Sequence, residues 1–296
     1  MIKNFIEKNN IEYYEDASLK KYNTYRIDAK CKYLVLPKDK EEFKLLIKYL
    51  NEVEFKYIVL GNGSNIILSF DYYDGVVILL NKLNELKISG ESIEVGAGYS
   101  LQKLALETSN LGLEGLEFAT GIPGLVGASI AMNAGAYNNS LSEVVTSVLV
   151  LNKDLEFVTM TNKEMKFSYR DSFFKQNKDY YIISANINLR QGEKQEILER
   201  VSKRRVKRLE TQPLDMPSAG SVFRNPEGMH AGALIENCGL KGFSIGGAQI
   251  SEKHANFIIN TGNATGKEII QLINRAKEDV QKKYNIELIL EQIVIE

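Results

Sequence analysis

Two glycine-rich loops are the first places in the sequence where chemistry can be expected. The first follows an apolar run typical of a buried strand, and its candidate contacts are Gly61, Asn62, Gly63, Ser64 and Asn65. The candidate contacts of the second are Gly121, Ile122, Gly124, Gly127 and Ala128. Glycine lets a backbone approach a ligand closely and present consecutive N–H groups to a phosphate, and a helix N-terminus would add its positive end. Each loop alone is more typical of a structural turn, but the pair favours a dinucleotide.

Neither loop carries a standard nucleotide-binding fingerprint. Ile66 stands where a Rossmann fingerprint would need its third glycine. A further glycine segment, residues 262–268, resembles a phosphate-binding P-loop, but its spacing is one residue short and Glu268 replaces the Ser or Thr that holds magnesium. We interpret that segment as a turn followed by a helix, with Thr265 and Glu268 as its capping box.

The scarcity of histidine and cysteine limits the chemistry that side chains alone can carry out. The two histidines are His230 and His254, and the two cysteines, Cys31 and Cys238, lie far apart. A Ser-His-Asp hydrolase or a multi-histidine metal site would have little to build with, and the cysteines indicate neither a disulfide framework nor a zinc site. The sequence therefore predicts no metal and a reaction that depends on a bound cofactor.

Length, composition and charge indicate a soluble protein with more than one domain. The chain has 296 residues, of which 44% are hydrophobic and 25% charged, and its net charge is −1. This balance gives no reason to expect nucleic acid or an anionic membrane as a partner. No apolar run approaches the roughly 20 residues that span a bilayer, and the charged N-terminal stretch lacks the apolar core of a signal peptide. We therefore expect a cytoplasmic location.

One dense basic cluster, residues 203–208, ends a long polar helix that is expected from about Lys194 to Leu209. The favoured interpretation is a solvated helix C-terminus whose positive charges complement the helix dipole. The alternative is an electropositive rim for a diphosphate substrate or for NADPH. RNA binding is a distant third, because no aromatic residues interleave with the charges.

The elements that must position these residues alternate between short strands and amphipathic helices, which indicates an α+β or α/β architecture. Asp39, with Glu42 three residues later, is expected to begin a helix with an apolar face formed by Phe43, Leu46, Ile47 and Leu50. A second helix should run from Ser100 to Asn110. Strands are expected at residues 33–36, 57–60, 76–80, 144–151, 180–189 and 286–295, with a hairpin at 86–95. Loops rich in Gly, Pro, Ser and Asn begin at Thr211 and place a domain boundary near residue 210.

Five segments, taken in order, match the motifs of one known family. Residues 59–65 and 121–127 with 132–137 resemble its two flavin loops, and Tyr169–Phe174 resembles its catalytic-arginine motif. Gln212-Pro213 followed by residues 217–226 resembles its catalytic-serine loop, and residues 246–256 are similar to a substrate-domain motif. The family is that of the UDP-N-acetylenolpyruvoylglucosamine reductases, and the matches span residues 23–296. Five motifs in the right order are far more specific than any one of them.

The resemblance implies an α+β protein with a vanillyl-alcohol-oxidase-type (PCMH-type) FAD-binding fold. The FAD-binding domain would span residues 1–209, in lobes of roughly 1–82 and 83–209. A smaller α+β substrate domain would span 210–285, and a closing strand at 286–296 would carry Glu291. FAD would be bound non-covalently, which agrees with the absence of histidine before position 230. The short connection between Arg190 and Lys194 is similar to the subgroup that lacks a tyrosine-bearing insertion.

The reaction implied by the resemblance is the reduction of an enolpyruvyl UDP-sugar by NADPH through FAD. Arg170 would stabilise negative charge on the substrate carboxylate, and Ser221 would donate a proton to the neighbouring carbon. Glu291 would assist as a protonated donor, for which burial should raise its pKa. By composition alone, Arg170 would be a surface ion-pair residue and Ser221 a plain turn residue.

Asn225, four residues after Ser221 in the same loop, would be a hydrogen-bond partner of the substrate, and Tyr137 and His254 are weaker candidates for substrate contacts. His254 is equally well explained as a surface residue paired with Lys253. Two other functions compete with the reductase. An oxidase of sugars or lactones on the same flavin fold would use oxygen, whereas a nucleic-acid-binding or partner-binding protein with a basic helix would use its glycine loops only as turns.

Overall fold

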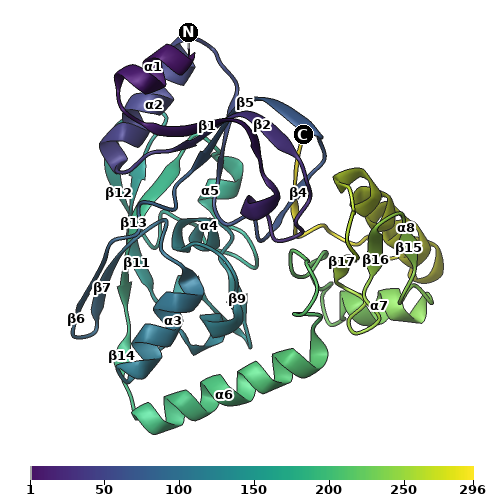
Figure 1. Ribbon diagram of the computed structural model, residues 1–296. Coiled ribbons are helices and arrows are strands. Elements are labelled where there is room, and N and C mark those ends of the chain that lie inside the picture. Colours follow the sequence, from purple (N-terminus) through teal and green to yellow (C-terminus); the bar gives the residue numbers. More distant parts are fainter. Residues whose placement is uncertain (1) are drawn as a thin grey trace. The chain divides into compact units, whose positions relative to one another are not determined.

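The computed structural model describes residues 2–296 and confirms the mixture of helices and strands expected of an α+β protein. A four-stranded sheet near the N-terminus has the strand order β1-β2-β5-β3 (Figure 1). Its strands are β1 (Glu12–Ser18), β2 (Lys30–Leu36), β3 (Tyr57–Leu60) and β5 (Tyr72–Leu79). The strands β3 and β5 are parallel. The helices α1 (Ile2–Lys8) and α2 (Lys40–Glu52) bury Ile6, Phe43 and Leu46 in one core with side chains of β2 and β5.

Helix α2 begins where the sequence predicts. The Asp39 carboxylate accepts hydrogen bonds from the backbone N–H groups of Glu41 and Glu42, at 3.0 and 2.9 Å. The Glu42 carboxylate does not return a bond to Asp39 but accepts the backbone N–H of Lys38 at 2.9 Å, so the cap is one-sided. The four predicted apolar positions of the helix are all buried.

A five-stranded antiparallel sheet follows, with the order β12-β11-β13-β7-β6. Its strands are β6 (Leu86–Ser89), β7 (Ser92–Gly96), β11 (Val145–Leu151), β12 (Phe157–Thr161) and β13 (Tyr181–Asn188). The predicted hairpin is therefore confirmed as β6 and β7. Buried side chains of this sheet form one core with those of α3 (Leu101–Asn110) and α4 (Val126–Ala131), and α5 (Phe173–Gln176) contributes Phe174.

Short elements connect these layers and include a two-stranded pair that precedes the long helix. The short strands are β8 (Leu113–Glu114), β9 (Gly135–Ala136), β10 (Asn139–Ser140) and β14 (Arg190–Gln191). The 3-10 turns are η1 (Lys20–Tyr22), η2 (Glu117–Gly121) and η3 (Leu141–Glu143). The strand β14 pairs with β8, and α6 (Lys194–Thr211) begins at once after it. The chain therefore has no room for an insertion between Arg190 and Lys194, as the sequence predicts.

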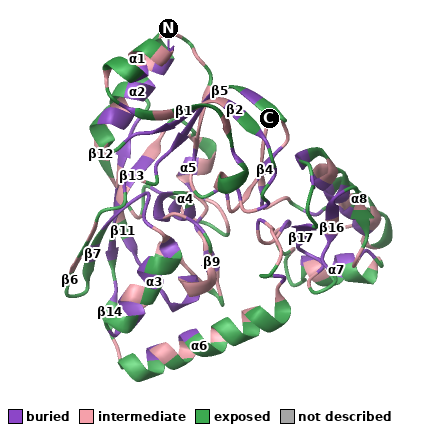
Figure 2. Ribbon diagram, in the orientation of Figure 1, coloured by how far each residue is buried: buried purple, intermediate pink, exposed green. Residues whose placement is uncertain are grey.

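The buried residues of helix α6 and the ion pairs of its Arg200 lie in the first half of the helix. Its buried residues are Ile197 and Val201, and Arg200 forms ion pairs with Glu114 at 3.1 Å and Glu117 at 2.8 Å. Figure 2 shows exposed residues along much of the helix, including its basic C-terminal half. The long polar helix expected from the sequence is confirmed, and a ligand contact of its basic residues stays a prediction.

The C-terminal segment forms a smaller α+β layer. The antiparallel sheet β15-β16-β17 consists of β15 (Ser244–Ile245), β16 (Ala248–Ile250) and β17 (Ile258–Asn260). The helices are α7 (Ala231–Asn237) and α8 (Gly266–Tyr284). Thr265 and Glu268 form the predicted capping box of α8, in which the Glu268 N–H donates to Oγ1 of Thr265 at 3.2 Å.

The closing strand is shorter than predicted, because the segment changes its pairing partner. A strand was expected over residues 286–295, but β18 spans only Ile293–Ile295 and pairs in parallel with β4 (Ile66–Leu68). Just before it, Leu290 forms an isolated bridge with Phe223. A chain that switches from one partner to another within three residues cannot continue one regular strand.

The chain divides into two compact units. The first consists of the N-terminal residues through Glu15, Tyr33–Asn62 and Gly75–Val206, and the second of Asp16–Lys32, Gly63–Asp74 and Lys207–Glu296. The second unit thus includes two N-terminal segments that the sequence-based division assigned to the FAD-binding domain. The functional domain boundaries predicted from the sequence remain a prediction. In the described part of the chain, no helix combines the length and apolarity required to cross a bilayer.

Candidate active site

The two glycine loops meet within the first unit, although residues 66–120 separate them in the sequence. A Cβ added to Gly61 would lie 2.8 Å from the Cβ of Ala128, and one added to Gly127 would lie 2.7 Å from the Cβ of Ala97. These distances are shorter than ordinary van der Waals contact, so glycine is needed for the chain segments to pack. The structure therefore brings the ends of the two predicted cofactor loops into contact.

The backbone at the start of α4 has protein partners. Its first two backbone N–H groups, of Val126 and Gly127, donate to the carbonyls of Tyr99 and Ala97, each at 2.9 Å. Contacts of Gly121, Ile122, Gly124, Gly127 and Ala128 with the cofactor stay predictions.

The first loop keeps free donors in the part that belongs to the second unit. Within that unit, as far as it is described, the backbone N–H groups of Gly63, Ser64 and Asn65 donate no hydrogen bond. Three consecutive donors of this kind suit a phosphate group. The side chain of Asn65 is committed elsewhere, because its amide donates to the carbonyl of Glu291 at 3.2 Å.

The close approach of a neighbouring chain segment leaves no room for a side chain at Gly63, which the sequence could not show. It has a φ of +62°, and an added Cβ would lie 2.2 Å from the carbonyl oxygen of Tyr22. Its own carbonyl accepts the backbone N–H of Thr24 at 3.1 Å. The glycine therefore allows the loop to lie against Tyr22–Thr24, whereas the sequence explained it only by approach to a phosphate.

We expect Gly63→Ala to lower the thermal midpoint and the flavin content together. The substitution places a side chain in a left-handed conformation, which costs about 1–3 kcal/mol, and also forces the Tyr22 carbonyl to move. Gly90→Ala is the matched control, because Gly90 has a φ of +61° but no atom within 4 Å of an added Cβ. Thermal melts and flavin absorbance per chain measure both effects. If Gly63→Ala matches Gly90→Ala in both, the close packing of this loop is irrelevant to the cofactor site.

Arg170 lies beside the segment that follows the second glycine loop. Its guanidinium Nη2 donates to the carbonyl of Gly135, and the group lies 5.1 Å from the centre of the Tyr169 ring. Asn133 donates from its side-chain amide to the carbonyl of Ser168 at 2.8 Å. The arginine motif and the segment 132–137 thus form one structural group in the first unit.

Tyr137 is positioned by the basic helix. Its hydroxyl donates to the carbonyl of Arg204 at 3.2 Å, and the Arg204 guanidinium lies 4.9 Å from the centre of the ring. Next to this contact, Lys203 forms an ion pair with Glu199 at 2.7 Å. Tyr137 keeps 38% of its surface exposed, so a role in substrate binding stays a prediction.

Ser221 and Glu291 are brought together in the second unit. Glu291 donates its backbone N–H to the carbonyl of Val222 at 2.8 Å, so it is paired with the residue that follows Ser221. Ser221 itself forms an isolated bridge with Phe257, and Gly220 before it has a φ of +75°. Both Ser221 and Glu291 are half-buried. Their proximity was implied by the family resemblance and could not be derived from the sequence spacing.

Asn256 forms hydrogen bonds with the two residues that follow Ser221, and the sequence analysis assigned it no role. Its side-chain oxygen accepts the backbone N–H of Phe223 at 2.9 Å, while its amide donates to the carbonyl of the same residue at 2.8 Å. The backbone N–H of Val222 also donates to the Asn256 carbonyl at 2.9 Å. Its position at the end of the motif 246–256 was the one available signal.

Asn225 and His254 have protein partners. The side-chain oxygen of Asn225 accepts the backbone N–H of Ala231 at 3.1 Å, at the start of α7. His254 packs against Phe257 and accepts the backbone N–H of Asn256 at its Nδ1, and burial lowers its pKa. The alternative of a surface pair with Lys253 is wrong, because the Lys253 ammonium donates to the carbonyl of Leu209. Substrate contacts of Asn225 and His254 stay predictions.

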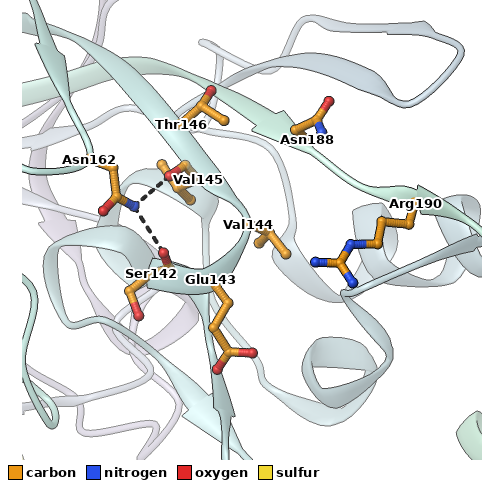
Figure 3. A pocket seen from close by; sticks show the side chains of 8 residues that line it. All are labelled: Ser142, Glu143, Val144, Val145, Thr146, Asn162, Asn188 and Arg190. Carbon is orange, nitrogen blue, oxygen red and sulfur yellow. Dashed lines mark hydrogen bonds between the residues drawn. The ribbon is translucent and has the colours of Figure 1, made fainter.

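A surface pocket of about 460 Å³ lies elsewhere in the first unit (Figure 3). The residues that line it are Ser142, Glu143, Val144, Val145, Thr146, Asn162, Asn188 and Arg190. The Glu143 carboxylate accepts hydrogen bonds from Asn139 and Ser140, and the Asn162 amide donates to the carbonyls of Ser142 and Val145. None of the residues predicted to bind cofactor or substrate lines this pocket, so it is not the predicted site.

Comparisons with known proteins support the predicted family. A family model described as the C-terminal domain of UDP-N-acetylenolpyruvoylglucosamine reductase matches residues 212–295, and one described as an FAD binding domain matches residues 31–161. Proteins named UDP-N-acetylenolpyruvoylglucosamine reductase are similar over most of the chain. The protein of Halalkalibacterium halodurans is 44% identical over 92% of this chain and 91% of its own length. That of Bacillus subtilis is 39% identical over 94% of this chain and 92% of its own length.

A solved structure supports the expected fold. The crystal structure of the UDP-N-acetylenolpyruvylglucosamine reductase from Thermus caldophilus has a TM-score of 0.82 and 33% sequence identity, and covers 97% of this chain and 99% of its own. Together with the FAD binding domain match, this similarity confirms the α+β, PCMH-type FAD-binding fold expected from the sequence.

Proposed function

The chain belongs to the UDP-N-acetylenolpyruvoylglucosamine reductase family, and we propose that Arg170, Ser221 and Glu291 carry out its reaction. The enzyme is an FAD-dependent oxidoreductase that uses NADPH to reduce the enolpyruvyl group of a UDP-sugar. The product is UDP-N-acetylmuramate, and the reaction is a step of peptidoglycan precursor synthesis. When bound, FAD supplies the hydride chemistry. The protein must bind the cofactor, hold the substrate, and manage the charge and the proton that accompany the reduction.

The first glycine loop fits the phosphates of FAD. The backbone N–H groups of Gly63, Ser64 and Asn65 have no acceptor within their unit, as described above. Anionic phosphate oxygens are strong acceptors for a row of such donors. We propose that Gly61 and Asn62, which precede them, also contact FAD, as do Gly121, Ile122, Gly124, Gly127 and Ala128 of the second loop.

Arg170 suits the stabilisation of negative charge on the substrate. Delivery of a hydride to the enolpyruvyl methylene carbon places negative charge on the adjacent carbon and its carboxylate. A guanidinium remains charged and can donate two parallel hydrogen bonds to a carboxylate. The bond from Nη2 to the Gly135 carbonyl fixes the position of the guanidinium beside the segment 132–137.

Ser221 and Glu291 suit delivery of the proton. The observation that carries this assignment is the backbone bond from Glu291 to Val222, which sets the carboxyl-bearing residue beside the serine segment. A serine hydroxyl can protonate a strongly basic carbon if the resulting alkoxide is stabilised nearby. We propose that Glu291 provides this support, and that Asn225, Tyr137 and His254 contribute to the surroundings of the substrate.

We further propose a cytoplasmic location, which the state of the cysteines supports. Cys31 and Cys238 are not joined by a disulfide, as expected in a reducing compartment. The partners proposed are small molecules, namely the enolpyruvyl UDP-sugar and NADPH.

We expect the purified protein to oxidise NADPH rapidly only when the enolpyruvyl UDP-sugar is present. Loss of NADPH absorbance measures the rate, and acid precipitation should leave the flavin intact in the supernatant. An oxidase of sugars or lactones would instead consume oxygen without this substrate and would usually retain flavin on the polypeptide. Rapid oxygen uptake with a simple sugar, and no response to the UDP-sugar, would refute the proposed function.

A further inference from the structure

The amide of Gln292 connects the two halves of the proposed proton-delivery site. Gln292 follows Glu291 directly and has 3% of its surface exposed. Its Nε2 donates to the carbonyls of Ala219 and Gly220, at 3.1 and 3.3 Å, and its Oε1 accepts the hydroxyl of Tyr25 at 3.0 Å. We propose that Gln292 is a positioning residue, which fixes the position of the turn before Ser221 relative to Glu291.

The orientation of this amide is fixed by its partners. Backbone carbonyls can only accept hydrogen bonds, so the Nε2 end must face Ala219 and Gly220. The Oε1 end then faces Tyr25, whose hydroxyl donates. Burial raises the pKa of Tyr25, so this hydroxyl stays protonated and remains a donor across the working pH range. A side chain with three hydrogen bonds in a buried site has one favourable position.

The turn that accepts the hydrogen bonds of Gln292 directly precedes Ser221 and determines the position of that serine. Gly220 has a left-handed φ of +75°, and its carbonyl and that of Ala219 both point to the same amide. Ala219 is 1% exposed, so its carbonyl has no ready access to water if the amide is removed. Loss of Nε2 therefore removes the contact that fixes the backbone immediately before the proposed proton donor.

Glu291 is fixed by the same arrangement. Its N–H donates to Val222 at 2.8 Å, and its carbonyl accepts the amide of Asn65 at 3.2 Å. Two residues later, the backbone N–H of Ile293 donates to the carbonyl of Asn65 at 3.0 Å. Gln292 thus lies where the chain passes from the serine segment to the first glycine loop, and a shift of its side chain would move Ser221 relative to Glu291.

The inference rests on the proposed roles of Ser221 and Glu291, and separate measurement of the two half-reactions tests it. The variants are Gln292→Met, which keeps the volume without hydrogen bonds, and Tyr25→Phe, which removes only the hydroxyl. Gln249→Met is the matched control, because Gln249 also donates from Nε2 to a backbone carbonyl and a second oxygen in the same unit. Stopped-flow absorbance of the holoenzyme follows flavin reduction by NADPH and reoxidation by the enolpyruvyl UDP-sugar.

We expect Gln292→Met to slow reoxidation by about 10-fold to 10²-fold, because small misplacements of reacting groups have effects of this size. Flavin reduction, flavin content and KM should change little, and Tyr25→Phe should show a weaker effect of the same kind. A merely structural role would lower flavin content and slow both half-reactions together, and that result would overturn the inference. Unchanged reoxidation in both variants would overturn it as well.

A parallel measurement on Ser221→Ala separates this inference from the proposed function. If Ser221→Ala slows reoxidation and the Gln292 and Tyr25 variants do not, only the positioning role is wrong. If Ser221→Ala has no effect but Gln292→Met does, the proposed role of Ser221 is wrong and Gln292 acts through Glu291. Should Gln292→Met fail to fold, Tyr25→Phe distinguishes the same outcomes, because it removes only the hydroxyl that donates to Gln292 and keeps the buried ring.

Discussion

Replacing Ser221 by alanine should slow flavin reoxidation by the enolpyruvyl UDP-sugar by about 10²–10⁴-fold, the usual range for loss of a general acid. Flavin reduction by NADPH should stay nearly unchanged, because it requires no proton from this serine. Ser221→Cys should recover part of the rate, since a thiol at the same position is also a proton donor. Stopped-flow absorbance resolves the two steps.

The matched control is Ser218→Ala, which removes a half-buried hydroxyl from the same loop. It should leave both steps close to wild type, because the bridge to Phe257 and the pairing with Glu291 involve residues 221 and 222. If Ser221→Ala instead slows reduction and leaves reoxidation intact, the serine belongs to the scaffold or to the nicotinamide site.

Arg170→Lys should impair the same half-reaction by about 10²-fold, comparable to the loss of one donor to a developing negative charge. A lysine keeps the charge but offers a compact ammonium, which cannot make paired bonds to a carboxylate and also bond to Gly135. Arg190→Lys is a control that makes the same change at the separate surface pocket. Equal rates for Arg170→Lys and wild type would show that the arginine has no part in charge stabilisation.

Much of the local structure could be predicted because its causes are local. The cap of α2 at Asp39 and the capping box of α8 each depend on residues within about four positions of one another. The hairpin β6-β7 pairs residues that are close in the sequence, from Ser89 with Ser92 to Leu86 with Val95. The apolar face of α2 follows from its helical periodicity. The family motifs added the order of the larger parts, which no single element could provide.

The contacts that define the candidate site could not be predicted, because they join distant parts of the chain. The Tyr25 hydroxyl and the Gln292 amide are 267 positions apart, and Asn65 reaches Glu291 across 226 positions. A buried glutamine just before a short apolar strand has no periodic signature that names its partners. Gly63 illustrates the same limit, since its glycine is required by the Tyr22 carbonyl as well as by any ligand.

The closing strand differs from the sequence-based expectation because tertiary partners decide which hydrogen bonds form. It was expected to be continuous, but the chain pairs first with Phe223 and then with β4. The local sequence pattern is compatible with either outcome.

The central claim is that this protein transfers reducing equivalents from its flavin to an enolpyruvyl UDP-sugar. The most direct test is a single turnover without oxygen: the holoenzyme is reduced by one equivalent of NADPH and then mixed with the sugar. We expect the absorbance of oxidised flavin to return and UDP-N-acetylmuramate to form in an amount equal to the flavin. Flavin that stays reduced until oxygen is admitted, with no UDP-N-acetylmuramate formed, would contradict the account.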